Sequence, residues 1–195
     1  MTGKTQIVAY INQSVRLTDQ EAEIFSAAFQ ERKIKKRQFI VQPDFIVKSR
    51  NYVLNGAFRA YVVDDNGQDS TIAFAIEDWW ITDYNSYILQ KPATMFVVAL
   101  EDSMILEISY EKEQALKQSN HKFETFFRIR AERTAAFMQQ RIISNLTQTA
   151  EERYESFINK YPQIVQRVPQ YALASYLGMT TEFLSRIRNK KANKK

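Results

Sequence analysis

The sequence predicts an α+β protein in which an antiparallel β-barrel or sandwich precedes a long helix and a helix-turn-helix. Apolar residues repeat with strand spacing from Gln38 to Ile108 and with helical spacing on either side. No Gly or Pro interrupts residues 119–148. The end of the chain has short apolar repeats around Gly178. We therefore expect three segments, residues 1–118, 119–148 and 149–195.

Composition excludes several classes of site. The 195 residues include no Cys and a single His, His121, so a thiolate metal site, a disulfide framework and a Ser-His catalytic site are not expected. We expect no metal, and we place His121 at the surface near a helix start. No apolar run is long enough for a signal peptide or a membrane span, which predicts a cytoplasmic protein without membrane contact.

Residues 4–30 are expected to form two helices. Thr18 can cap the second helix, and Glu21 completes a capping box. A basic run follows, which is either a solvated strand edge or loop, or a secondary contact to the DNA backbone or a partner. This run consists of Lys33, Lys35, Lys36 and Arg37.

Seven short runs of strand-forming residues come next. Asp64-Asp65-Asn66-Gly67 joins two of them, and an Asn-Gly pair in that setting predicts a β-hairpin. Because no helical pattern separates the runs, we expect an antiparallel barrel or sandwich. The runs are Phe39–Val41, Phe45–Lys48, Tyr52–Leu54, Phe58–Val63, Ser70–Ile76, Met95–Leu100 and Met104–Ile108.

Residues 77–93 form the longest break in the strand pattern and its most aromatic part, with Trp79, Trp80, Tyr84 and Tyr87. These rings could hold a ligand, or they could fill the inside of the barrel. Both interpretations stay open at this point.

A long helix is expected from Asn120 or His121 to about Thr147. Roughly 28 residues extend about 42 Å, which is more than one small barrel covers. The remaining apolar face is expected to pair with the same helix of a second copy in a parallel coil, although the helix could instead pack only on its own barrel. The residues expected on the dimerisation face are Phe123, Phe127, Thr134, Phe137, Met138 and Arg141.

Three further helices are expected after residue 148. Thr149 can cap the first, Thr149–Tyr161, and Pro162 stops it. Gln170–Leu177 and Thr181–Asn189 form a helix-turn-helix around Gly178, which can adopt the positive φ of a sharp turn. The apolar residues expected on the inner faces are Leu173, Leu177, Leu184 and Ile187.

The excess positive charge lies at this end of the chain. Residues 181–195 contain six Lys or Arg and one Glu, which equals the formal net charge of +5 of the whole chain. A neutral body with a basic end is typical of a DNA-binding protein, although an ordinary α domain with a solvated tail would share the pattern. The residues expected to contact DNA are Thr180, Thr181, Glu182, Ser185, Arg186, Arg188, Asn189 and Lys190.

Several short motifs occur in the order strands, long helix, helix-turn-helix. They are Asn55-Gly56-Ala57-Phe58-Arg59-Ala60-Tyr61, Asp65-Asn66-Gly67, Glu107-Ile108-Ser109 and Thr180-Thr181-Glu182-Phe183-Leu184-Ser185-Arg186. With them, essentially the whole chain resembles the Crp/Fnr family of transcription regulators. The stretch Ala150-Glu151-Glu152-Arg153-Tyr154 with Phe157 resembles a branch common in Bacteroidetes-type bacteria.

The resemblance implies a cyclic-nucleotide-binding-like jelly roll, a homodimer, no enzymatic activity, and double-stranded DNA and RNA polymerase as partners. The family reads base edges with a Glu and an Arg four residues apart, which would be Glu182 and Arg186. A carboxylate can accept from cytosine N4, and a guanidinium can bind guanine O6 and N7. The same pair could also be a plain helix salt bridge.

The nucleotide pocket of that family does not match well. There a Glu contacts the ribose, an Arg ten residues later holds the cyclic phosphate, and a small residue follows the Arg. These positions fall on Asp83, Ala93 and Thr94, and Ala93 cannot neutralise a phosphate. We therefore predict no tight binding of cAMP or cGMP, and no cofactor. The candidate pocket for another effector consists of Trp79, Trp80, Asp83, Tyr84 and Thr94.

The chain departs from the family in one more respect. It is not expected to form a full β-wing, because little chain follows the second helix of the motif. The basic tail Lys190–Lys195 is expected to take over the phosphate contacts of the wing.

The leading interpretation is a homodimeric regulator that binds an inverted-repeat operator with half-sites about 34 Å apart. The alternative is a ligand- or partner-binding module that has lost specific DNA binding. A barrel enzyme of the cupin type would need clustered His and carboxylate ligands, which a single His does not supply.

Overall fold

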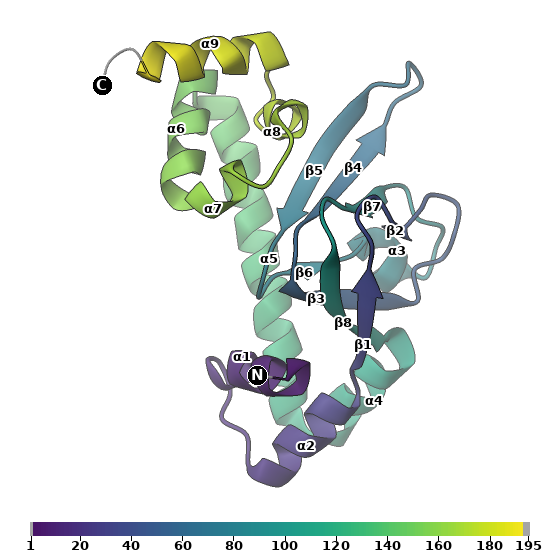
Figure 1. Ribbon diagram of the computed structural model, residues 1–195. Helices are drawn as coiled ribbons and strands as arrows, with labels where there is room; N and C mark the ends of the chain where they lie inside the picture. The colour runs from purple at the N-terminus through teal and green to yellow at the C-terminus, as the bar shows by residue number, and fades with distance from the viewer. Residues whose placement is uncertain (1, 193–195) are drawn as a thin grey trace.

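The structure is a computed structural model that describes the backbone of residues 2–192 and the side chains of residues 2–190. Lys194 and Lys195 of the expected basic tail lie outside the described residues, as does the side chain of Lys191. Two four-stranded antiparallel sheets, a long helix and a small helical unit follow one another along the chain (Figure 1).

The two sheets form a jelly roll, as predicted. One sheet has the order β1-β8-β3-β6 and the other β2-β7-β4-β5, which is the strand order of two interlocked Greek keys. The strands are β1 (Gln30–Ile34), β2 (Phe39–Val41), β3 (Ser49–Asn55), β4 (Phe58–Val63), β5 (Asp69–Ala75), β6 (Trp80–Ile81), β7 (Phe96–Ala99) and β8 (Ser103–Ser109).

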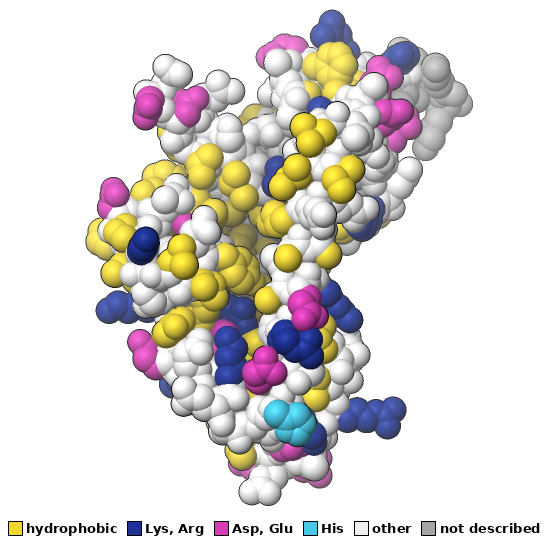
Figure 2. Space-filling model, turned by 180° about the vertical axis from the view of Figure 1, so that it is seen from behind, with side chains coloured by type: hydrophobic (Ala, Val, Ile, Leu, Met, Phe, Trp, Pro, Cys, Tyr) yellow, Lys and Arg dark blue, Asp and Glu magenta, His cyan; other side chains and the backbone are white. Residues whose placement is uncertain are grey.

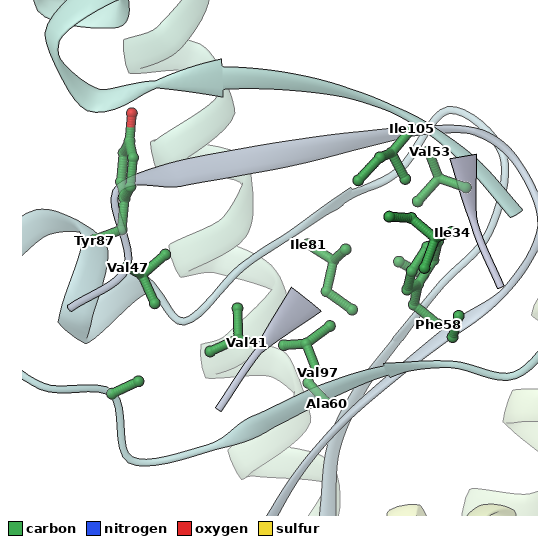
Figure 3. Close-up of a cluster of buried hydrophobic side chains, with 13 residues drawn as sticks. Ile34, Val41, Val47, Val53, Phe58, Ala60, Ile81, Tyr87, Val97 and Ile105 are labelled. Carbon is green, nitrogen blue, oxygen red and sulfur yellow. The ribbon is translucent and has the colours of Figure 1, made fainter. Parts of the chain in front are cut away.

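Side chains from both sheets meet in one apolar core, shown in Figure 3. Val53 and Ile105 come from one sheet, and Phe58 and Val97 come from the other. All four are fully buried. The alternation of inward and outward residues along the strands produces this core, and it is the pattern by which the sequence predicts the strands.

Four elements of this region differ from the sequence prediction, including β6, which lies within the stretch expected to be a break between strands. Phe45–Lys48 is not a strand, because only an isolated bridge joins Ile46 to Pro92, and a proline has no N–H to extend the ladder. β1 was not predicted because its single buried residue is Ile34. A short helix, α3 (Tyr84–Leu89), interrupts the aromatic stretch.

The basic run continues from β1 into an exposed turn, where the Lys36 N–H donates to Asp102.

A second core joins the N-terminal helices to the base of the long helix. It contains α1 (Gly3–Asn12), α2 (Asp19–Ala27), α4 (Tyr110–Ser119) and α5 (His121–Thr147). The predicted capping box of Thr18 and Glu21 is present. Glu21 also accepts hydrogen bonds from Lys122 and Asn120 at 2.7 and 2.9 Å. The Lys122 bond, the Thr18 N–H and the Asn120 amide lower the Glu21 pKa to about 2.

Helix α5 begins and ends where predicted, with Asn120 as its cap and His121 exposed. Two residues in its first turns do not lie on an exposed dimerisation face, contrary to the sequence prediction. Phe123 and Phe127 are only 1% and 3% exposed, because α1 and α2 fold back and cover them. A second copy cannot reach these two rings in this structure.

The C-terminal unit contains α6 (Ala150–Lys160), α7 (Pro162–Val165), α8 (Gln170–Tyr176) and α9 (Thr181–Ala192). The turn before α9 has Gly178 at φ +68°, as the sequence predicts. Pro162 does more than end α6, because it is also the first residue of α7. The predicted inner residues Leu173, Leu177, Leu184 and Ile187 are buried together.

Among the residues that the structure describes, no helix has both the length and the apolar content needed to cross a bilayer.

The core around α2 offers a direct stability test. Phe25 is fully buried and its ring contacts those of Phe29, Phe123, Phe126 and Phe127. We expect Phe25→Ala to lower the free energy of unfolding by about 3–5 kcal/mol, because it leaves a cavity. The measurement is chemical denaturation.

The matched control is the neighbouring Ile24→Ala, since Ile24 is half exposed. We expect it to cost less than about 1 kcal/mol. Equal losses in the two variants would contradict the packing described for α2.

Candidate nucleic-acid interface and ligand cavity

Helix α9 has a buried apolar side and an exposed polar side. Leu184 and Ile187 pack against the other helices of the unit. The Thr180 hydroxyl accepts from the Phe183 N–H at 3.1 Å and caps the start of the helix. The predicted DNA contacts that are exposed in the structure are Thr180, Glu182, Arg186, Arg188, Asn189 and Lys190.

The predicted base-reading pair is available for new contacts. Glu182 and Arg186, which both lie in the described range, do not form a direct ion pair. The Glu182 backbone N–H, the Thr180 hydroxyl and the Arg186 charge lower the Glu182 pKa, so this carboxylate is ionised at neutral pH. The Arg186 guanidinium lies 5.3 Å from the Phe183 ring. Both charged groups are thus held at the surface.

Two other predicted contacts are partly occupied within the chain. Ser185 is half-buried, accepts from the Gln170 side chain at 2.6 Å, and donates to the Thr181 carbonyl. It therefore joins α8 to α9. Thr181 is also half-buried. Lys190 is exposed and lies 3.6 Å from Glu151.

The C-terminal unit is fastened to the jelly roll by contacts that the sequence analysis did not find. The Ser175 hydroxyl accepts from the Thr71 N–H at 2.8 Å. Arg141 of α5 donates to the carbonyls of Thr71 at 3.1 Å and Tyr176 at 3.3 Å, and also to the Ile72 carbonyl. Its predicted dimer contact is therefore replaced by a contact within the chain.

A second fastening is an ion-pair cluster. Arg167 donates to Glu77 at 2.6 and 2.9 Å and also pairs with Glu101. Partial burial alone would raise the Glu77 pKa, but hydrogen bonds from Arg167 and the Gly56 N–H outweigh it and hold the pKa below its ordinary value. The cluster joins the loop before α8 to two loops of the jelly roll.

A cavity of about 630 Å³ lies between the jelly roll and α5. Figure 2 shows the hollow, with hydrophobic side chains on both sides of it. Trp79, Trp80 and Tyr84, three of the predicted pocket residues, line its wall. Three residues expected on the dimerisation face line it from α5. They are Thr134, Phe137 and Met138.

Asp83 and Thr94, the other two predicted pocket residues, do not line this cavity. Asp83 is 0% exposed. One of its carboxylate oxygens accepts from the Ser86 N–H at 3.1 Å and the other from the Thr94 N–H at 2.9 Å. Asp83 therefore caps α3 and fastens the strand that follows, and Ala93 is buried next to Thr94.

Another apolar surface lies on the upper part of α5. Ile142, Ile143 and Leu146 are 60%, 51% and 80% exposed. Yellow side chains follow this part of the helix in Figure 2. A soluble helix rarely exposes three large aliphatic side chains within two turns unless another surface covers them.

No protein-family model and no curated protein sequence matches the chain. Solved structures match over most of its length. The c-di-GMP-responsive regulator CLP of Xanthomonas campestris has a TM-score of 0.72 at 14% identity, over 91% of this chain and 93% of that chain. FixK2 of Bradyrhizobium japonicum has a TM-score of 0.73 at 16% identity, over 85% of both chains.

A structure assigned to the crp/fnr family of transcriptional regulators, from Eubacterium rectale, has a TM-score of 0.68 at 16% identity. It covers 91% of this chain and 85% of that chain. The chain has the Crp/Fnr fold. The fold implied by the sequence resemblance is thereby confirmed. The Crp/Fnr fold accounts for the jelly roll, α5 and the helix-turn-helix in one arrangement.

The ion-pair cluster makes stability depend on pH. Arg167→Gln should lower the free energy of unfolding at pH 7 by about 1–2 kcal/mol, since it removes charged hydrogen bonds that are partly screened by solvent. The folded-state Glu77 pKa lies below its ordinary value of 4.5, so this stabilisation is present above that pH and is lost as the pH falls through the folded-state pKa.

Thermal unfolding of both proteins between pH 3 and 7 measures this effect. The control is Arg128→Gln, which breaks an exposed pair with Glu132 and should change little. A difference between Arg167→Gln and the unchanged protein that stays constant over the whole range would contradict the assignment to Glu77.

Proposed function

We propose that this protein is a sequence-specific DNA-binding transcription regulator of the Crp/Fnr type. The observation that carries the proposal is the polar face of α9, which presents Glu182 and Arg186 to solvent while its apolar side is buried. The alternative, a module that has lost DNA binding, would not need two exposed charges that have no ion-pair partner among the described residues.

The chemistry of that face fits base recognition in a major groove. The Arg186 guanidinium can donate two hydrogen bonds to guanine O6 and N7, and the Glu182 carboxylate can accept from cytosine N4. Arg188, Asn189 and Lys190 lie toward the end of the helix, where they can contact phosphates and fix the register of the protein on the duplex.

A homodimer completes this function. The exposed side chains of Ile142, Ile143 and Leu146 supply an apolar strip on α5 that the same strip of a second copy can cover. Two copies related by a two-fold axis would place two α9 helices in successive major grooves, about 34 Å apart. The operator is then an inverted repeat. We place the protein in the cytoplasm, with RNA polymerase as its further partner.

Cyclic nucleotides are not the proposed signal. The carboxylate that would contact a ribose belongs to Asp83, and both its oxygens already accept backbone hydrogen bonds. The position that would hold a cyclic phosphate is the buried Ala93, which has no charge to offer. Tight binding of cAMP or cGMP in this site is therefore unfavourable.

Selection of bound fragments from random duplex DNA tests the function. We expect an inverted repeat, and Arg186→Ala should weaken binding to it by about 1–3 kcal/mol and relax the preference at one base pair of each half-site. Arg188→Ala is the matched variant, because a lost phosphate contact weakens all sequences alike.

Binding to the selected operator should also weaken steeply as salt rises, because phosphate contacts release counterions. Recovery of no preferred sequence with either protein, whatever the salt concentration, would favour a ligand- or partner-binding module instead.

The dimer can be tested separately. Leu146→Glu places a charge on the apolar strip and should weaken self-association by at least about tenfold, because a buried unpaired charge is costly. Sedimentation equilibrium measures the change. His121→Glu, at the exposed start of the same helix, serves as control. A monomer in the unchanged protein would refute the proposed dimer.

A further inference from the structure

The cavity between the jelly roll and α5 has two cationic side chains that the proposed function does not explain. Arg130 and Arg133 lie one turn apart on α5, and both line the cavity. Among the described residues, neither guanidinium has a carboxylate partner within ion-pair distance. The Arg130 Nε atom is shielded from solvent and has no hydrogen-bond acceptor among the described side chains.

One carboxylate on the wall offsets only one of these two positive charges. The carboxylate on the wall is that of Asp78, which accepts from the Gln6 amide at 2.9 Å and from the Tyr52 hydroxyl. The Arg130 guanidinium instead lies 5.3 Å from the Tyr10 ring. The cavity therefore has an excess of positive charge and of hydrogen-bond donors.

The remaining wall is rich in aromatic rings. Trp79, Tyr84, Phe137 and Tyr161 line the space together with Trp80. Rings of this kind offer flat apolar surfaces against which another ring can stack. A cavity of about 630 Å³ has the size of sites that hold small organic ligands.

We propose that this cavity binds a small aromatic anion, with its ring system among the aromatic side chains and its carboxylate, sulfonate or phosphate group on Arg130 and Arg133. Guanidinium groups bind such oxyanions through paired, charge-assisted hydrogen bonds. The acid group is held from α5 and not from the loop after α3, where Asp83 and Ala93 offer no anion site.

The site also touches the C-terminal unit. The rings of Trp79 and Tyr161 lie 5.3 Å apart, and both line the cavity. A ligand ring that displaces the Trp79 or Tyr161 ring would change how α6 packs against the jelly roll. Control of DNA binding by the ligand rests on the proposed function, whereas the binding of the anion does not.

A matched pair of fluorescent probes tests the proposal on the full chain. 8-Anilinonaphthalene-1-sulfonate is an aromatic anion, and N-phenyl-1-naphthylamine has the same rings without the sulfonate. Fluorescence titration should show saturable binding of the sulfonate at one site per chain, with an affinity at least about tenfold higher than that of the neutral probe.

Variants assign that preference to the two arginines. Arg130→Gln combined with Arg133→Gln should weaken sulfonate binding by about tenfold or more and leave the neutral probe unchanged. Arg128→Gln, which removes a cation from the same helix outside the cavity, should leave both affinities unchanged. Circular dichroism and thermal unfolding establish that each variant is folded.

Arg130→Lys combined with Arg133→Lys is the second variant, because it keeps both charges. We expect it to retain a clear preference for the sulfonate probe. Equal affinities for the two probes in the unchanged protein would overturn the proposal. Undiminished sulfonate binding in the folded double Gln variant would also overturn the proposal. A sulfonate affinity that falls as protein concentration rises would overturn it too, since a second copy would then occupy the cavity.

The DNA experiment separates the two proposals. Operator binding without any preference for the anionic probe would overturn the ligand assignment alone. A clear anion preference without operator binding would overturn the regulator assignment and leave the cavity assignment standing.

Discussion

One guanidinium joins the three parts of this molecule. Arg141 lies on α5 and donates to carbonyls of β5 and to the last carbonyl of α8. Its Cζ atom also lies 4.1 Å from the centroid of the Tyr176 ring. Burial lowers the Arg141 pKa, yet the carbonyl dipoles and the ring replace much of the hydration that the charge has lost. The orientation of α9 relative to the jelly roll depends on this contact, together with the Arg167 cluster.

The sequence predicts what depends on local periodicity and on local hydrogen bonds. The hairpin at Asn66-Gly67, the caps at Thr18 and Thr149, and the limits of α5 all follow from residues that are close in sequence, and each is present. β1 is different, because it has only one buried residue and so no strand pattern in its sequence. Its pairing with β8 makes it a strand. The single bridge at Ile46 shows the converse case, an apolar run without a partner strand.

The site was predictable only in part, for the same physical reason. Trp79, Trp80 and Tyr84 could be found because aromatic residues cluster in one short stretch. Arg130 and Arg133 could not, because their place on the cavity wall depends on how α5 is rotated against the jelly roll. Phe123 and Arg141 show the same limit. An apolar or long side chain on a helix looks available for a partner until the tertiary fold shows what already covers it.

The contact between Arg141 and β5 uses main-chain carbonyls of Thr71 and Ile72, while Ile72, Ala73 and Phe74 of the same strand line the cavity. β5 therefore contributes both to the contact with Arg141 and to the cavity wall. Substitutions along this strand can change the shape of the cavity without removing an acceptor from the joint. Different side chains at these positions would therefore give cavities of different shape on one and the same carbonyl contact between β5 and the helix that carries Arg141.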